Sequence, residues 1–475
     1  MTWESIEQLY KDAGQEGLFY HVNSLSKEDK LKFHKNLLKV ANREPPAKLI
    51  KDCQDAINLH EANGAVGSTS IKPLPPTSYQ SIIGDEKTEM EYYKLGHDAI
   101  QRGEVAIILM AGGQGTRLGS TLPKGCYDIN LPSHKSLFQI QSEKIVALQK
   151  SCPGCIIPWY IMTSAPTRQA TEKFFQENDY FHLQKDQIVF FNQGTLPAFS
   201  SNGEHLLLAN QTDLFESPDG NGGLYRSLKD NHIIDDFHKR GIKHIYVYCV
   251  DNVLSRLADP VFIGFAIKHG FQLATKAVRK RDAHEPVGLI ATRNNRPCVI
   301  EYSEISRELA ESTNEEGLLQ FRAGNIVNHY YHIDLLSKSL DQWCNTIPYH
   351  VAKKKITYYD NIKDQYFKPE EPNGIKLEQF IFDVFPTIPL DKFGCLEVER
   401  SKEFSPLKNG PGSKVDNPDT SRLAYLKLGT QWLKDAGAIV KDGVLVEVSN
   451  KLSYGGENLL QFNGKEFNED GFYLE

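Results

Sequence analysis

Short apolar segments alternate with helix-like segments over residues 105–250, and this alternation constrains the fold more than any other feature of the sequence. The apolar segments have the length of strands, and they are Val105–Met110, Ile156–Met162, Gln187–Asn192 and His244–Val250. Helix-like segments such as Leu137–Lys150 and Pro166–Glu177 separate them. This order predicts an α/β fold with a doubly wound, mostly parallel sheet that is covered on both faces. Such sheets bind ligands beyond the carboxyl ends of their strands, so functional residues are expected in the loops after Met110, Asn192 and Val250.

The segments on either side have a different character. Residues 1–100 are polar, and Lys27–Ala41 predicts an amphipathic helix that ends before Pro45 and Pro46. Residues 62–80 are rich in Gly, Ser and Pro and predict a connection. Towards the other end, the sequence predicts a helix over Thr420–Ala436 and strands over Val444–Val448 and Leu459–Phe462. We therefore expect a mainly helical domain over 1–100, a core domain over 101–392 and a small domain over 393–475, with a packing role for the first.

Composition excludes several classes of protein. The formal net charge of −7 and the pI of about 6.1 argue against a nucleic-acid binder with a broad basic surface. The first residues, MTWESIEQLYKDAG, contain no continuous apolar run of the kind found in secretory signals, and the longest apolar runs are too short to span a membrane. Eight scattered cysteines do not form the pattern of a disulfide framework. We expect a cytoplasmic protein that binds neither nucleic acid nor membrane.

A glycine-rich loop follows the first predicted strand, in the string LMAGGQGTRLGSTLPKG. Its glycines allow close approach of the backbone to a ligand, and exposed N–H groups there can bind phosphate oxygens. Arg117 and Lys124 add two cations to the same loop, which suits a triphosphate. The glycines taken alone are also compatible with a tight turn between a strand and a helix.

Two better-known glycine loops do not fit this string. A Walker A loop requires Gly-Lys followed by Ser or Thr, and no such sequence occurs here. The dinucleotide-binding pattern G-x-G-x-x-G fails because Leu118 occupies the position of the third glycine. The second strand, which ends near Met162-Thr163-Ser164, also lacks the acidic residue that would bind a ribose.

The combination of Gly113-Gln-Gly115-Thr116-Arg117-Leu118 with Pro123-Lys124 resembles the motif of nucleotidyltransferases that join a nucleoside triphosphate to a sugar 1-phosphate. The full string resembles the eukaryotic UDP-N-acetylglucosamine pyrophosphorylase family, whereas UDP-glucose pyrophosphorylases carry a loop of the Asn-Gly-Gly-Leu-Gly-Thr type. The resemblance continues in family order over about 300 residues. It includes Phe190–Phe199, Pro218–Tyr225, Val247–Asn252, Glu285–Ile290, Val299–Ile305, Ala323–Ile326, Pro372–Phe385 and Phe404–Asn409.

The resemblance implies a Rossmann-like nucleotidyltransferase core, catalytic over 101–392, with small N-terminal and C-terminal domains. The implied reaction converts UTP and N-acetylglucosamine 1-phosphate to UDP-N-acetylglucosamine and pyrophosphate, with Mg²⁺ as cofactor. Because the attacking sugar phosphate is already an anion, no general base is needed, and catalysis consists of positioning and electrostatics. Two alternatives stay open: another sugar 1-phosphate, from N-acetylgalactosamine or glucose, or a catalytically silent nucleotide-sugar sensor. The sequence leaves the oligomeric state open, and a monomer is the expected form.

The resemblance also implies roles for individual residues. Catalysis would use the cations Arg117, Lys124 and Lys408, which offset charge on the triphosphate and on departing pyrophosphate. The nucleotide would contact Leu109, Met110, Ala111, Gly112, Gly113, Gly115, Thr116, Gln193, Gly220, Asp251 and Lys376. The sugar phosphate would contact Asn221, Gly222, Gly288, Glu301, Tyr302 and Asn325. Asp251 would also hold Mg²⁺, because it follows a strand of the sheet and offers the oxygen ligand that this ion prefers.

Each of these residues has a purely structural interpretation as well. Gln193 is compatible with a strand-end residue facing water, and Asp219–Gly223 with a glycine turn before a helix. Asp251 is compatible with a helix cap, and isolated lysines such as Lys376 and Lys408 with solvated surface residues. The functional interpretation depends on the family motifs around them.

Overall fold

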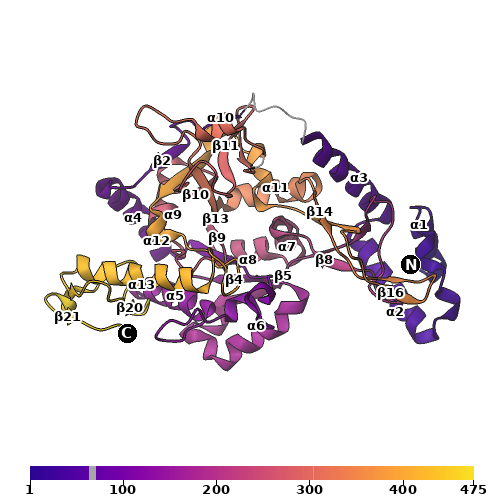
Figure 1. Cartoon of the computed structure of the whole chain (residues 1–475), viewed down its shortest axis with the longest axis horizontal. Coiled ribbons are helices and arrows are strands. Elements are labelled where there is room, and N and C mark those ends of the chain that lie inside the picture. The colour runs from indigo at the N-terminus through magenta and orange to yellow at the C-terminus, as the bar shows by residue number, and fades with distance from the viewer. Residues whose placement is uncertain (64–70, 303) are drawn as a thin grey trace. The chain divides into compact units, whose positions relative to one another are not determined.

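A mixed sheet of eleven strands forms the centre of the larger of two units in the computed structural model, which describes residues 1–63, 71–302 and 304–475 (Figure 1). The larger unit comprises Ser68–Asn192, Ser227–Gln342 and Val384–Glu475. The smaller unit comprises Met1–Gly67, Gln193–Arg226 and Trp343–Asp383. Both units therefore combine segments that are far apart in the sequence.

The main path of the sheet has the strand order β2-β18-β10-β13-β9-β3-β4-β5. β13 is antiparallel to its neighbours β9 and β10, and the other pairs along this path are parallel. This arrangement confirms the predicted α/β fold with a mostly parallel sheet. The strands of the path are β2 (Tyr79–Ser81), β3 (Val105–Met110), β4 (Trp159–Thr163), β5 (Ile188–Asn192), β9 (His244–Cys249), β10 (Leu273–Arg279), β13 (Ala323–His332) and β18 (Phe393–Val398). The other three are β1 (Ile71–Lys72), β11 (Leu289–Arg293) and β12 (Arg296–Ile300).

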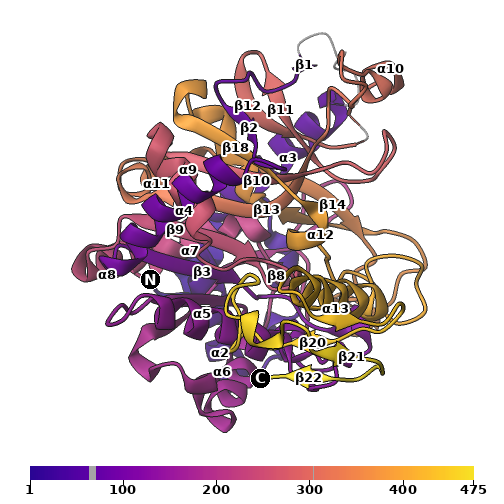
Figure 2. The ribbon, with the colours of Figure 1, turned by 90° about the vertical axis from the view of Figure 1, so that its left-hand side faces the viewer.

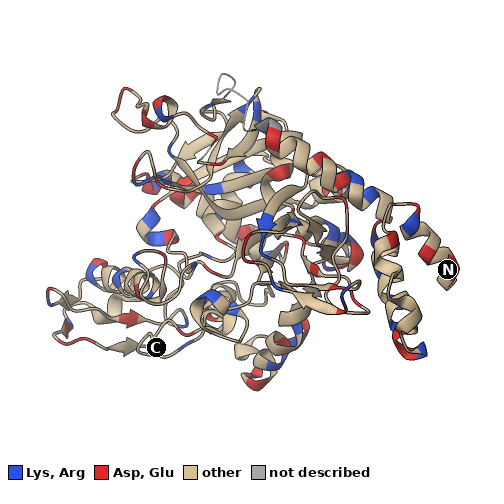
Figure 3. Cartoon of the chain, turned by 45° about the vertical axis from the view of Figure 1, so that its right-hand side comes forward, with Lys and Arg blue, Asp and Glu red and all other residues tan. Residues whose placement is uncertain are grey.

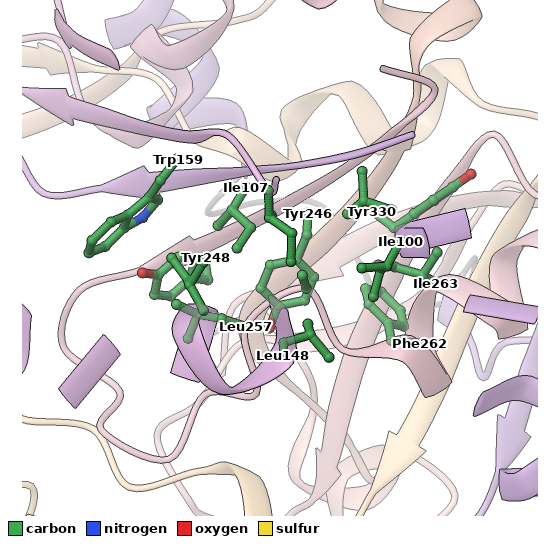
Figure 4. Close-up of a cluster of buried hydrophobic side chains, with 14 of the residues drawn as sticks. Ile100, Ile107, Leu148, Trp159, Tyr246, Tyr248, Leu257, Phe262, Ile263 and Tyr330 are labelled. Carbon is green, nitrogen blue, oxygen red and sulfur yellow. The ribbon is translucent and has the colours of Figure 1, made fainter. Parts of the chain in front are cut away.

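The larger unit is held together by an aromatic and aliphatic core on the central strands (Figure 4). All six residues of β3 are buried, which explains why its sequence is continuously apolar instead of alternating. Trp159 on β4 is fully buried, as are Tyr246 and Tyr248 on β9. Rings of this size contribute much of the apolar area that drives folding.

Helices cover the faces of this sheet, as predicted. The predicted helices at Leu137–Lys150 and Pro166–Glu177 correspond to α5 and α6. The helices of the larger unit and its borders are α4 (Glu86–Gln101), α5 (Leu137–Ser151), α6 (Ala165–Glu177), α7 (Leu224–Asp230), α8 (Ile233–Arg240), α9 (Pro260–His269), α10 (Arg307–Glu311), α11 (Ile333–Thr346), α12 (Arg400–Glu403) and α13 (Pro418–Asp435).

The predicted domain boundaries at residues 100 and 392 do not coincide with the boundaries of the two units. Residues before position 100 supply β2 to the central sheet and α4 to its cover. Helix α4 approaches α9 so closely that a Cβ atom on Gly96 would overlap the backbone of Pro260. A boundary at 392 would likewise separate β18 from β10, with which it pairs over six residues. The predicted connection over residues 62–80 lies partly outside the described residues, and its later part contains β1 and the start of β2.

The chain after β18 contains the predicted C-terminal helix and small strand pairs (Figure 2). Helix α13 begins at Pro418, and Asn417 caps it by accepting a hydrogen bond from the Thr420 amide at 2.8 Å. The strand predicted at Val444–Val448 is limited to β20 (Glu447–Val448). The strand predicted at Leu459–Phe462 is wrong, because Leu460–Phe462 forms one turn of 3₁₀-helix. The other short strands are β19 (Ile439–Val440), β21 (Glu466–Phe467) and β22 (Tyr473–Leu474).

The smaller unit joins the N-terminal helices to two later segments through one apolar core. The helix predicted over Lys27–Ala41 is confirmed as α2 (Lys27–Arg43), and the proline at position 46 is the first residue of the next helix. Its helices are α1 (Trp3–Lys11), α2 and α3 (Pro46–Asn63). Its strands are β6 (Thr195–Pro197), β7 (Phe199–Ser200), β8 (Glu216–Pro218), β14 (His350–Lys354), β15 (Tyr358–Asp360), β16 (Gln365–Phe367) and β17 (Gly374–Glu378).

Charged residues of both signs are interspersed along the elements of the chain (Figure 3). Among the described residues, no helix is both long enough and apolar enough to cross a membrane.

Candidate active site

The glycine-rich loop leaves the carboxyl end of β3 and folds back on itself. The amide of Gly115 donates to the carbonyl of Leu122 at 3.1 Å, and the amide of Lys124 donates to the carbonyl of Gly113 at 3.3 Å. A Cβ atom on Gly115 would lie 2.9 Å from the Leu122 carbonyl oxygen, so the close return of the chain requires glycine there. Gly119 ends the intervening 3₁₀ turn with a φ of 75°, in the left-handed region that favours glycine. The loop therefore presents the exposed residues Thr116 and Arg117 beyond the edge of the sheet.

Three of the predicted charged residues gather at the carboxyl end of β9. Lys124 Nζ lies 3.7 Å from Asp251 Oδ2, and both side chains are about four-fifths buried, with 18% and 22% exposed. Burial raises the pKa of the nearby Cys249 thiol, Asp251 raises it further, and Lys124 and Lys408 lower it. Because all three charges act on one thiol, they lie in the same neighbourhood although they are far apart in the sequence.

Backbone hydrogen bonds fix the segment that carries Lys408 to the segment that carries Asp251. The amide of Leu407 donates to the carbonyl of Asp251 at 2.8 Å. Asn252 reinforces this contact from its side chain, which accepts from the Ser405 amide at 2.9 Å and donates to a backbone carbonyl of α12 at 2.7 Å. Lys408, although it comes after the last strand of the central sheet in the sequence, therefore lies near Asp251 at the end of β9.

Three of the six residues predicted to contact the sugar phosphate also lie together, namely Gly288, Glu301 and Asn325. The amide of Asn325 donates to the carbonyl of Gly288 at 2.8 Å. A Cβ atom on Gly288 would lie 3.6 Å from Glu301 Oε1, so the carboxylate faces this glycine. Asn325 Oδ1 accepts from the amide of Val327, a β-branched residue with a φ of 56°. Tyr302 is 56% exposed and lies next to residue 303, which is outside the described residues.

The remaining predicted residues belong to the smaller unit, where the segments around Gln193 and Gly220 are neighbours. β6 pairs with β8, so that Thr195 lies opposite Pro218, and the amide of Asp219 donates to the carbonyl of Gly194 at 3.3 Å. Gly220 has a φ of 85°, and a Cβ atom there would overlap the carbonyl of Gln379.

The end of β17 closes this loop from a third segment. Gln379 donates its amide to the carbonyl of Asp219 and accepts from the amide of Gly222, each at 2.8 Å. Asn221 accepts a hydrogen bond from the amide of Ile381 at 2.9 Å, so its side-chain oxygen is the acceptor there and its side-chain nitrogen is the group that can donate. Lys376 on β17 is half-buried, and burial followed by repulsion from Lys354 lowers its pKa.

Sequence reasoning missed one residue of this loop structure. Arg43, at the end of α2, contacts the carboxylate of Asp219 and the backbone of Thr195. The segment before residue 100 was expected only to pack, and a single arginine there offers no motif.

Together these groups have the chemistry needed to bind polyanions. Arg117, Lys124 and Lys408 supply positive charge at the carboxyl edge of the sheet, and Asp251 places a carboxylate, the kind of oxygen group that hard cations prefer, beside Lys124. Among the described residues there is no cluster of three or more His, Cys, Asp or Glu side chains that could hold a metal by themselves. A metal at Asp251 would therefore take its other ligands from water and bound phosphates.

Comparison with known proteins agrees with this chemistry. The family model described as UTP–glucose-1-phosphate uridylyltransferase matches residues 51–412. UDP-N-acetylglucosamine pyrophosphorylase of Saccharomyces cerevisiae is 66% identical over 472 residues, which cover 99% of this chain and 99% of the relative. UDP-N-acetylhexosamine pyrophosphorylase-like protein 1 of Xenopus tropicalis is 39% identical and covers 99% of this chain and 96% of its own.

A solved structure gives the same result. The crystal structure of uridine diphosphate N-acetylglucosamine pyrophosphorylase from Trypanosoma brucei, in complex with an inhibitor, superposes with a TM-score of 0.84 at 25% identity, covering 100% of this chain and 98% of that one. The family resemblance of the glycine-rich loop is thereby confirmed. The chain belongs to the UTP–glucose-1-phosphate uridylyltransferase family and, within it, to the eukaryotic UDP-N-acetylglucosamine pyrophosphorylases.

Proposed function

We propose that the protein transfers the uridylyl group of UTP to N-acetylglucosamine 1-phosphate and releases pyrophosphate. The observation that carries this proposal is the grouping of Lys124, Asp251 and Lys408 at the carboxyl end of β9, beside the glycine-rich loop. A phosphate oxygen of the sugar attacks the α-phosphorus of UTP, and the bond to the β-phosphate oxygen breaks in line with it. Negative charge moves to pyrophosphate during this step, so fixed cations at that place stabilise the transition state more than the ground state.

Different residues bind different parts of the two substrates. The backbone of the loop after β3 and Gln193 hold uracil, since a side-chain amide can donate and accept on the pyrimidine edge. Arg117, Lys124 and Lys408 offset phosphate charge, and the donor nitrogen of Asn221 contacts the sugar phosphate. Because the nucleophile is an anion, none of these residues has to remove a proton.

Glu301 belongs at the sugar end of the substrate. Its carboxylate would repel phosphate but accepts hydrogen bonds from sugar hydroxyls, and it faces Gly288 next to Asn325. We place the acetamido group of the sugar beside Gly288 and Asn325. This placement favours an N-acetylated sugar over glucose, which lacks that group.

Enzymes that act on nucleoside triphosphates commonly use a divalent metal ion, and we propose Mg²⁺ here. The described residues fit it, since one carboxylate, Asp251, stands at the end of a strand beside the cations that bind phosphate. Bound Mg²⁺ would supply charge neutralisation at the α-phosphate. We further propose that the protein acts as a monomer in the cytoplasm.

Pyrophosphate release from UTP, measured with a panel of sugar 1-phosphates, tests the reaction. We expect turnover with N-acetylglucosamine 1-phosphate that requires Mg²⁺ and exceeds turnover with N-acetylgalactosamine 1-phosphate and glucose 1-phosphate. Turnover with none of them would contradict the proposed enzymatic activity and would favour the alternative of a nucleotide-sugar sensor. Preference for another sugar would overturn the substrate assignment and keep the uridylyl transfer.

Replacing Asp251 with asparagine should raise the Mg²⁺ concentration required for half-maximal activity by about 10-fold or more, because a neutral amide binds the ion less strongly than a carboxylate. Initial rates measured over a Mg²⁺ titration give this value. Asp186→Asn, at an exposed aspartate of the same unit, is the matched control and should not change it. An unchanged Mg²⁺ dependence in Asp251→Asn would show that Asp251 is not the ligand.

A further inference from the structure

Helix α2 carries four polar residues on one stripe, and they contact the segment that leads into the Gly220 loop. Lys32, Asn36, Lys39 and Arg43 are spaced by four, three and four residues, which places them on one face of the helix. Their acidic partners are spaced by three residues along the second segment. The ion pairs are Lys32–Asp213 at 2.9 Å, Lys39–Glu216 at 3.0 Å and Arg43–Asp219 at 2.5 Å.

The last of these pairs differs from the others in burial. The side chains of Lys32 and Lys39 are 56% and 66% exposed, as expected for surface pairs that contribute little to stability. Asp219 is only 1% exposed, and Arg43 is 25% exposed. A buried carboxylate needs a cation with good geometry, so this pair is under a constraint that the outer pairs do not share.

The guanidinium of Arg43 bridges two loops of the proposed nucleotide site. One nitrogen, Nη2, donates to Asp219 Oδ2, and the other, Nη1, donates to the carbonyl oxygen of Thr195. A Cβ atom on Gly194 would overlap both nitrogens, so the planar group lies directly against that glycine. Gly194 follows Gln193, and Asp219 precedes Gly220. One side chain therefore links the two segments to which binding is assigned.

Asp219 occupies the inside of its own loop. A Cβ atom on Gly223 would overlap Asp219 Oδ1, which means that the carboxylate fills the turn formed by residues 220–223. Oδ1 is buried and has no hydrogen-bond partner among the side chains and backbone groups described. Burial raises the pKa of Asp219, and Arg43 opposes this shift. The arginine thus contacts the group around which the loop is built and offsets the cost of burying its charge.

We propose that Arg43 is a positioning residue that fixes the Gln193–Thr195 segment relative to the Gly220–Gly223 loop and thereby sets the affinity for uridine nucleotides. This inference rests on the proposed function, which assigns these two segments to the nucleotide and the sugar phosphate. It gives the N-terminal helices an indirect part in substrate binding. The guanidinium contacts Asp219 and Thr195, so its effect on the substrate passes through the two loops.

Binding of UTP and UDP, measured by titration calorimetry on the full chain, tests this inference. We expect Arg43→Ala to weaken UTP binding by about 10- to 100-fold, as for a supporting residue whose loss misplaces binding groups. At saturating UTP, kcat should fall much less than the affinity. Arg43→Lys should give an intermediate loss, since a single ammonium can pair with Asp219 but does not reproduce the two-pronged contact. Lys32→Ala, from the same stripe of α2, is the matched control and should bind normally.

A double variant separates positioning from simple charge compensation. Arg43→Met with Asp219→Asn removes the buried charge and its partner together, so it should recover the thermal stability lost in Arg43→Ala. It should not recover UTP affinity, because methionine cannot donate to the Thr195 carbonyl. Recovery of both, or wild-type UTP affinity in folded Arg43→Ala and Arg43→Lys, would overturn the inference. Failure of the wild-type protein to bind any uridine nucleotide would instead contradict the proposed function.

Discussion

Replacing Lys124 with alanine should lower kcat for uridylyl transfer by about 10²–10³, which corresponds to about 3–4 kcal/mol of lost transition-state stabilisation. The lysine stands at the end of the glycine-rich loop with its ammonium 3.7 Å from the Asp251 carboxylate and only 18% of its side chain exposed. Because this position is largely shielded from solvent, a fixed charge acts more strongly on charge that develops in the transition state than it would in water. Single-turnover rates at saturating UTP measure this effect without a contribution from binding.

The control for Lys124→Ala is Lys150→Ala, which removes an exposed lysine from α5 in the same unit and should leave kcat unchanged. Near wild-type kcat with a raised KM in Lys124→Ala would mean that the loop binds UTP without stabilising the transition state. Because Lys124 and Asp251 are close, the losses of activity caused by replacing each of them should not add. The double variant Lys124→Ala/Asp251→Asn should cost less than the sum of the two single variants.

The strands of the central sheet could be predicted from the sequence because their environment imposes a simple pattern. β3 and β9 are covered on both faces, so they are continuously apolar, and both were predicted to within one residue. The segment Leu459–Phe462 shows the limit of this reasoning. It has an apolar composition similar to that of a short strand, but the following Gly464, with a φ of 74°, belongs to a turn, and the segment forms a 3₁₀ turn before it. Short apolar runs do not distinguish these two outcomes.

The division into two units could not be predicted, because amino-acid composition describes stretches of consecutive residues and each unit combines separate stretches. The smaller unit combines the N-terminal helices with residues 193–226 and 343–383, and no change of composition marks those later boundaries. For the same reason the sequence predicted roles for Asp251 and Lys124, which the structure brings to within 3.7 Å of each other, but none for Arg43. The first two stand in loops after strands, where α/β sheets place functional groups, whereas Arg43 meets Asp219 across 176 positions. Long-range pairs of this kind depend on tertiary structure.

A buried ion cluster joins three elements of the larger unit, β10, α9 and α12. Lys276 on β10 is completely buried, its ammonium lies 2.6 Å from Asp259 Oδ2, and it also pairs with Glu403. Asp259 caps α9, and Glu403 ends α12, whose backbone receives the side chain of Asn252. The cluster therefore connects β10 and α9 to the segment that leads to Lys408.

Replacing Lys276 with methionine should lower the free energy of unfolding by about 3–5 kcal/mol, because it removes the cation that contacts both buried carboxylates and leaves Arg256, 3.9 Å from Asp259, to compensate their charge. Urea unfolding of the full chain measures the loss. Lys268→Met, which removes a pair with Glu91 in which both side chains are about half exposed, is the matched control and should cost less than about 1 kcal/mol.

The pH dependence of the stability lost in Lys276→Met shows whether charge or packing causes the loss. Burial raises the pKa of Glu403, and repulsion from Asp259 raises it further, whereas Lys276 and Arg256 lower it. Without the lysine, the pKa in the folded protein should lie still further above its value in the unfolded chain. A group of this kind contributes stability at low pH that is lost as the pH rises through its folded pKa. The destabilisation by Lys276→Met should therefore be smaller at pH 5 than at pH 8, and an equal loss at both values would show that the cost arises from packing instead of charge.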